Sequence, residues 1–171
     1  MLRSLATVLV LALALGVPAT GAVEDPTRLL RFPDVHGDQV LFTYGGDLWR
    51  ASASGGAAAR LTAHPGLELF GKFSPDGRRA GYVRENNLYV EDLASGAITQ
   101  LTMDGSRTMI NGTFDWVYEE EFGLRDGFRW SPDGKAIAYW QLDATGVRDF
   151  LLINNTDSLY SYTIPVQYPK A

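Results

Sequence analysis

The feature that most constrains the fold of this chain is a repeat of about 40 residues. When residues 41–62 are aligned with residues 81–102, a shift of 40 positions without gaps, five positions are identical. These pairs are Leu48 with Leu88, Gly56 with Gly96, Ala57 with Ala97, Leu61 with Leu101 and Thr62 with Thr102. Self-similarity at this spacing is typical of β-propellers, in which each blade is a four-stranded sheet of about 40 to 45 residues. We therefore expect an all-β fold.

A second self-match joins two Ser-Pro-Asp-Gly turns. Residues 73–77 read Phe-Ser-Pro-Asp-Gly and residues 130–134 read Trp-Ser-Pro-Asp-Gly, and a strand-like run follows each of them, reaching Tyr82 or Tyr139. Proline presets the backbone angle of the first central turn position, and glycine suits the last corner. Two strands are therefore expected to meet as a hairpin at each of these turns.

Counting the repeats gives a partial β-propeller of about three four-stranded blades. The blades are expected at about residues 32–62, 73–102 and 128–157, with an insertion at residues 103–127 that breaks the repeat. Closed propellers have about four to eight blades, so three blades leave sheet edges unpaired. Residues 23–171 are therefore predicted to form an incomplete propeller, which further blades or oligomerisation would complete.

The first 22 residues have the pattern of a secretory signal peptide. They contain Arg3, an apolar run over residues 5–17 and small residues up to Ala22. The alternative is an uncleaved anchor, but the apolar run is shorter than the roughly 20 residues that a membrane-spanning helix needs. We expect residues 1–22 to be removed and the mature chain to begin near Val23. The protein is then exported, periplasmic or extracellular, and has no stable membrane span after cleavage.

Composition excludes several classes of function. The 171 residues include 15 Lys plus Arg and 20 Asp plus Glu, so a formal net charge of -5 offers no basic surface for nucleic acid. Cysteine is absent, and the two histidines, His36 and His64, are 28 positions apart, so we expect no metal and no cofactor. No serine lies in a Gly-x-Ser-x-Gly motif. No catalytic residue is therefore assigned, and enzyme activity stays an open question.

The insertion carries an acidic and aromatic stretch at residues 115–123, which reads Asp-Trp-Val-Tyr-Glu-Glu-Glu-Phe-Gly. Three consecutive carboxylates repel one another, and a nearby cation relieves that repulsion. An ammonium group has three donors and can be shared between two carboxylates, while the ring of Trp116 or Tyr118 adds a favourable face for a cation. The charges alone leave two interpretations open, a cation site and a solvated acidic turn.

From residue 73 to residue 171 the chain resembles the propeller of the dipeptidyl peptidase IV group of prolyl oligopeptidase-type serine peptidases. The segments that carry this resemblance are Asn-Leu-Tyr-Val at 87–90, Asn-Gly at 111–112, the stretch 115–121, the turn 130–134, Ala-Tyr at 138–139 and Tyr-Pro-Lys-Ala at 168–171. In that family the second and third glutamates of the acidic run bind the free amino terminus of a peptide. The resemblance carries this role over to Glu120 and Glu121, with Trp116, Tyr118 and Glu119 as supporting neighbours.

Residues 29–72 resemble a different group, the first propeller blades of tricorn-type peptidases and TolB-like proteins. The resemblance lies in Phe-Pro-Asp-Val-His-Gly-Asp at 32–38, Tyr-Gly-Gly-Asp-Leu-Trp at 44–49 and Leu-Thr-Ala-His-Pro-Gly at 61–66. The leading hypothesis is that this chain is the substrate-recognition propeller portion of an exported dipeptidyl-peptidase-like enzyme. The hydrolase domain of that enzyme lies outside this chain. Its partner is a peptide with a free N-terminus. The alternative is an exported non-catalytic propeller that acts as a binding or scaffold module.

Overall fold

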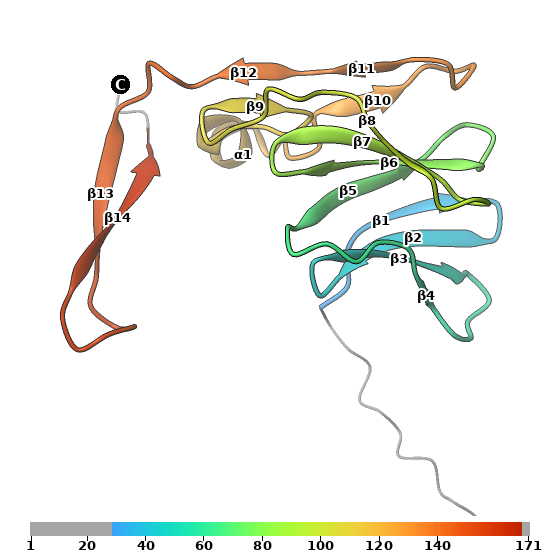
Figure 1. The fold of residues 1–171 in the computed structure, drawn as a ribbon, viewed down its shortest axis with the longest axis horizontal. Helices are drawn as coiled ribbons and strands as arrows, with labels where there is room; N and C mark the ends of the chain where they lie inside the picture. Colours follow the sequence, from blue (N-terminus) through green and yellow to red (C-terminus); the bar gives the residue numbers. More distant parts are fainter. Residues whose placement is uncertain (1–28, 169–171) are drawn as a thin grey trace, which may run out of the picture.

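The computed structural model describes residues 29–168, and strands dominate this part of the chain (Figure 1). Two four-stranded antiparallel sheets come first, each with its strands in chain order. The first contains β1 (Arg31–His36), β2 (Gln39–Tyr44), β3 (Asp47–Ser52) and β4 (Ala59–Arg60). The second contains β5 (Glu68–Phe73), β6 (Arg79–Arg84), β7 (Asn87–Asp92) and β8 (Ile98–Gln100). The predicted all-β fold, a partial β-propeller, is confirmed.

The two sheets share one hydrogen-bonding arrangement at positions 40 residues apart. In the first sheet the amide of Leu48 donates to Thr62 Oγ1 at 2.9 Å, and in the second the amide of Leu88 donates to Thr102 Oγ1 at 2.9 Å. The amide of Leu61 also donates to the carbonyl of Leu48, and the amide of Leu101 to the carbonyl of Leu88, each at 2.8 Å. These bonds extend the attachment of the short strands β4 and β8 to β3 and β7.

Apolar side chains fill the space between the two sheets. One buried cluster consists of Leu41, Phe73 and Ala80, and a second of Leu48, Tyr82 and Tyr89. Each of these clusters joins residues of both sheets, so burial of apolar surface holds the sheets together. A third cluster contains Phe70, Val83, Leu88 and Phe128. Because Phe128 follows the second sheet in sequence, this cluster extends the core into the next part of the chain.

Residues 109–143 form a less regular third part of the fold. Its strands are β9 (Met109–Asn111), β10 (Phe128–Trp130), β11 (Ile137–Tyr139) and β12 (Gln141–Asp143), with β10 paired to β11 and β9 paired to β12. Trp140 joins the two pairs, because its amide donates to the carbonyl of Gly127 and its carbonyl accepts from the amide of Gly112, each at 2.9 Å. Strands β11 and β12 therefore form one extended run that pairs first with β10 and then with β9.

The two Ser-Pro-Asp-Gly turns close the hairpins β5–β6 and β10–β11, as expected. Gly77 donates its amide to the carbonyl of Ser74 at 2.8 Å, and Gly134 donates to Ser131 at 2.8 Å. Both glycines have positive φ, 68° and 67°, a conformation that costs little only without a Cβ atom. Each serine hydroxyl also accepts the amide five residues later, at 3.0 Å and 2.9 Å.

The chain then leaves this region in a two-stranded hairpin, β13 (Asp149–Asn154) and β14 (Tyr162–Gln167). Figure 1 shows the hairpin standing apart from the two four-stranded sheets, joined to the rest near the end of β12. The predicted signal peptide, residues 1–22, lies outside the described residues. Within residues 29–168, no helix has the length and apolar character that a membrane crossing requires.

Candidate functional site

The acidic stretch folds into the short helix α1 (Trp116–Phe122), between β9 and β10. Its N-cap is Asp115, whose side chain accepts a hydrogen bond from the amide of Tyr118 at 3.1 Å. It ends at Gly123, which has φ 65° in the left-handed region and donates its amide to the carbonyl of Glu119 at 3.1 Å. Seven residues are too few for a helix to be stable alone in water, so these caps and the surrounding packing define it.

The three glutamates of α1 have different surroundings. Glu119 is half-buried, and burial raises its pKa above the ordinary value, helped by the charges of Glu120 and Asp115 and opposed by Arg125. Glu120 and Glu121 are exposed. Successive helical residues project about 100° apart, so the two exposed carboxylates lie on adjacent sides of the helix and both reach solvent. A cation approaching from outside can therefore meet Glu120 and Glu121 without displacing other side chains.

Aromatic rings hold the helix from both sides. Tyr118 stacks on Phe114 with ring centroids 5.3 Å apart, and Phe114 contacts Trp140 at 6.0 Å. On the other side, Trp116 lies 4.3 Å from Tyr168, at the base of the β13–β14 hairpin. The two aromatic residues that sequence analysis assigned as supports of the cation site therefore pack against other rings. These contacts pack the helix against Phe114 and against the base of the hairpin.

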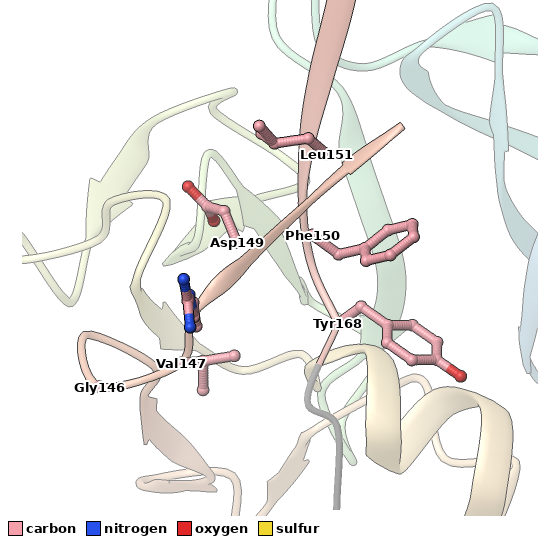
Figure 2. Close-up of a pocket in the computed structure, with 7 residues that line it drawn as sticks. Gly146, Val147, Asp149, Phe150, Leu151 and Tyr168 are labelled. Carbon is pink, nitrogen blue, oxygen red and sulfur yellow. The ribbon is translucent and has the colours of Figure 1, made fainter. Parts of the chain in front are cut away.

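Two cavities flank the helix. The one in Figure 2, of about 610 Å³, lies at the base of the hairpin and is lined by residues 146–151 and Tyr168. The other, of about 570 Å³, is lined by residues on either side of α1, among them Phe114 and Leu124. Glu120 and Glu121 line neither of these cavities. The two exposed carboxylates therefore lie on the surface and outside both cavities.

The loop that follows the helix carries a charged residue that sequence analysis did not single out. Asp126 forms an isolated backbone bridge with Thr113 and lies 2.7 Å from Lys72 Nζ and 3.0 Å from Arg129 Nη1. Partial burial raises the pKa of Asp126, but the hydrogen bond and charge of Lys72, with those of Arg129, outweigh this and hold it below its usual value. Lys72 and Asp126 are 54 positions apart, and no local motif connects them.

Within residues 29–168, no group of three or more His, Asp or Glu side chains could hold a metal ion. The other contact that sequence analysis missed is that of Trp116 with Tyr168. Tyr168 was noticed in the Tyr-Pro-Lys-Ala motif, but its position beside the helix depends on the path of the whole hairpin.

Comparison with known proteins identifies related sequences. Residues 36–171 match the family model described as the dipeptidyl peptidase IV (DPP IV) N-terminal region. A probable dipeptidyl peptidase 4 of Aspergillus flavus is 37% identical over 107 residues, which are 59% of this chain and 14% of that protein. Human prolyl endopeptidase FAP is 37% identical over 101 residues, 58% of this chain and 13% of that protein. This chain therefore matches only a small part of each of these relatives.

A solved structure is also similar. The crystal structure of Porphyromonas gingivalis dipeptidyl peptidase 4 superposes with a TM-score of 0.67 and 28% sequence identity. The similarity covers 83% of this chain and 20% of that one. The family match starts at residue 36, so it also includes most of residues 29–72, the segment whose motifs resemble tricorn-type and TolB-like blades.

Proposed function

This chain belongs to the family of dipeptidyl peptidase IV N-terminal regions. From this premise we propose that it is the substrate-recognition propeller portion of an exported serine peptidase. The peptidase acts on peptides with a free N-terminus. In this proposal Glu120 and Glu121 bind the ammonium group of the substrate. The nucleophile comes from a hydrolase domain outside residues 1–171. The contribution of this chain is then to hold and orient the peptide.

The observation that carries the proposal is the exposure of two adjacent carboxylates on a short, firmly capped helix. An ammonium group has three N–H donors, so it can donate to both carboxylates at once. Hydrogen bonds between charged groups are about twice as strong as neutral ones. An acetylated N-terminus has lost its positive charge and most of its donors. Recognition of this kind therefore distinguishes a free peptide amine from a blocked one.

Two exposed glutamates also give the peptide a fixed register. If the ammonium group is held at α1, the number of residues between the N-terminus and the bond to be cleaved is determined by the distance from α1 to the nucleophile. An enzyme built in this way removes short pieces of constant length. This property would follow from placing the recognition helix on a rigid propeller, because binding groups on rigid elements hold a substrate more precisely than those on mobile loops.

The proposal is tested by the double substitution Glu120→Gln and Glu121→Gln, which keeps side-chain size and removes both charges. Binding of a dipeptide amide with a free amine, and of its N-acetylated form, is measured by calorimetry. In the protein that joins this chain to a peptidase domain, KM for the same pair of substrates reports the same contact. Charge-assisted hydrogen bonds contribute roughly 1.5 to 3 kcal/mol each, so the free-amine ligand should bind about tenfold or more weakly to the variant.

A matched control is Glu85→Gln, which removes one exposed carboxylate in the turn between β6 and β7. The unchanged chain and the control should both prefer the free amine, while the double variant should lose that preference and keep its fold. An equal affinity of the unchanged chain for both peptides would contradict the proposal. It would instead favour the non-catalytic binding or scaffold propeller.

A further inference from the structure

The helix that carries the glutamates sits on a loop that is closed at a narrow neck. The amide of Gly127 donates to the carbonyl of Gly112 at 2.9 Å, and Thr113 forms a backbone bridge with Asp126. A Cβ atom on Gly127 would lie only 3.0 Å from backbone atoms of Gly112 and Thr113. The two arms of the loop therefore run in direct backbone contact, one on each side of α1 in the chain.

One ion pair joins this neck to the second sheet. Asp126 is part of the neck, and its carboxylate lies 2.7 Å from Nζ of Lys72, which belongs to β5. The side chains of Lys72 and Asp126 are 24% and 31% exposed, so water and salt screen this pair less than a fully exposed one. Arg129 also contacts Asp126, but its side chain is 64% exposed and it belongs to β10, which directly follows the loop. Of the two cations that contact Asp126, Lys72 is the one that belongs to a sheet preceding the loop.

We propose that the Lys72–Asp126 ion pair positions α1 on the propeller, so that Glu120 and Glu121 stand where they can meet the substrate amine. Neither Lys72 nor Asp126 touches the peptide in this arrangement, so both are positioning residues. The inference rests on the proposed function of the two glutamates. It adds that the placement of Glu120 and Glu121 depends on the ion pair of Lys72, a residue of the second sheet that lies 48 positions before Glu120.

Breaking the pair should loosen α1 and leave its glutamates chemically unchanged. In the variants Lys72→Met and Asp126→Asn we expect hydrogen exchange of the backbone amides at residues 116–122 to accelerate. We also expect the free-amine dipeptide to bind about threefold or more weakly, because residues remote from a ligand typically change its affinity by this order. Binding of the acetylated dipeptide should stay as it is, since it does not use the glutamate charges.

The double variant and a conservative variant separate positioning from general damage. If the two residues act through their pair, Lys72→Met with Asp126→Asn should be no worse than either single change, whereas independent effects would add. Lys72→Arg retains the charge and should restore both the slow exchange and the affinity. Arg129→Met is the matched control, because it removes the other cation at Asp126 and leaves the connection to β5 intact. It should exchange and bind like the unchanged chain.

The measurement uses the full 171-residue chain, with thermal melting recorded for each variant. If Asp126→Asn unfolds, Lys72→Met and Lys72→Arg still give the answer. Unchanged exchange at residues 116–122 in a folded Lys72→Met variant overturns the inference, whether or not the peptide binds. Failure of the unchanged chain to prefer the free amine overturns the proposed function. An affinity for the free-amine dipeptide that is undiminished in both single variants overturns the positioning role alone.

Discussion

Glu91 is a carboxyl residue buried between the two four-stranded sheets. It is 3% exposed, lies on β7, and its Oε2 atom has no hydrogen-bond partner among residues 29–168. Burial and, to a lesser extent, the negative charge of Glu68 raise the pKa of Glu91 to about 7, against the opposing positive charge of Arg50. The side chain is therefore protonated in mildly acidic solution, and ionisation at higher pH places an incompletely satisfied charge in the core.

This burial predicts a pH-dependent stability. An unfolded chain gives Glu91 a pKa near 4.5, so between pH 4.5 and about 7 the folded state binds the proton more tightly than the unfolded state. The free energy of unfolding contributed by this group is therefore greatest below pH 4.5 and falls as the pH rises through 7. The whole fall is about 3 kcal/mol. Glu91→Gln, which has no charge to lose, should be more stable than the unchanged chain at pH 8.

Urea unfolding at pH 5 and at pH 8 checks this prediction. The difference in unfolding free energy between the two pH values should be clearly smaller for Glu91→Gln than for the unchanged chain. Glu85→Gln serves as control, because it removes an exposed carboxylate and should leave the difference intact. A Glu91→Gln variant that loses as much stability on going to pH 8 as the unchanged chain would show that Glu91 does not titrate in this range.

The ends of β4 and β8 illustrate what a sequence repeat can predict at the scale of elements. Alignment at a shift of 40 pairs Thr62 with Thr102, and the structure gives both hydroxyl groups the same task of accepting a strand amide. A repeat can reveal such elements because each threonine bonds a residue 14 positions before it, within the same repeat unit. The two Ser-Pro-Asp-Gly hairpins belong to the same class, since their turns are held by bonds within six residues.

Other elements depend on distant residues and were not predictable. Helix α1 is seven residues long, and its Trp116 packs against the ring of Tyr168, which no periodicity places beside it. Phe32 and Phe70 adopt φ of 53° and 57° at irregular positions of β1 and β5, although a bulky residue is strained in the left-handed region. Their rings contact one another at 4.3 Å. Burial and ring packing across two sheets offset that strain. Neither can be predicted from the sequence, because the two phenylalanines are far apart in the chain.

The matched threonines give a prediction at this scale. Thr102→Val keeps the shape of the side chain but removes the oxygen that accepts the amide of Leu88 at 2.9 Å and donates to Asn87 Oδ1 at 3.0 Å. Both partners are buried, so each is left with an unmade hydrogen bond. We expect a loss of about 1 to 3 kcal/mol in unfolding free energy.

Thr62→Val should cost a similar amount, because Thr62 stands in the equivalent place and is also buried. Thr102→Ser keeps the hydroxyl group and should lose clearly less stability than Thr102→Val. Denaturant unfolding of the three variants decides the question. A loss that is the same for Thr102→Ser and Thr102→Val would attribute the effect to packing of the methyl group and not to the hydrogen bonds.

The described part of the molecule is unevenly packed. The two four-stranded sheets share buried clusters, whereas the strands after residue 108 are paired only two by two. The repeat predicted sheets with unpaired edges. The third blade was expected at about residues 128–157, which include β13, whereas Figure 1 shows the β13–β14 hairpin standing clear of the two four-stranded sheets. The base of the hairpin is tied to the rest of the fold by long-range contacts, the ring contact of Tyr168 with Trp116 and the ion pair of Asp149 with Arg107.

The hairpin is apolar on both faces. Register pairing places Leu151 and Ile153 on one face, and Phe150 and Leu152 on the other. Leu151 and Ile153 are 57% and 73% exposed, and near its tip Leu159 is 91% exposed. Strands with apolar side chains on both faces are typical of sheets that are covered on both sides. Exposed apolar patches and unpaired strand edges are also the usual sites of association between copies of a chain.

We therefore expect the 171-residue chain to self-associate through this hairpin. Burying a large aliphatic side chain contributes about 1.5 to 3 kcal/mol, so Leu151→Ser with Ile153→Ser should weaken association by about tenfold or more. Met103→Ser is the control, because Met103 is 82% exposed but lies outside the hairpin. Sedimentation velocity over a range of protein concentrations measures the association. The unchanged chain and the control should shift to larger species as the protein concentration rises. The hairpin variant should remain monomeric up to higher concentrations. An unchanged chain that stays monomeric throughout would mean that its exposed apolar faces do not associate.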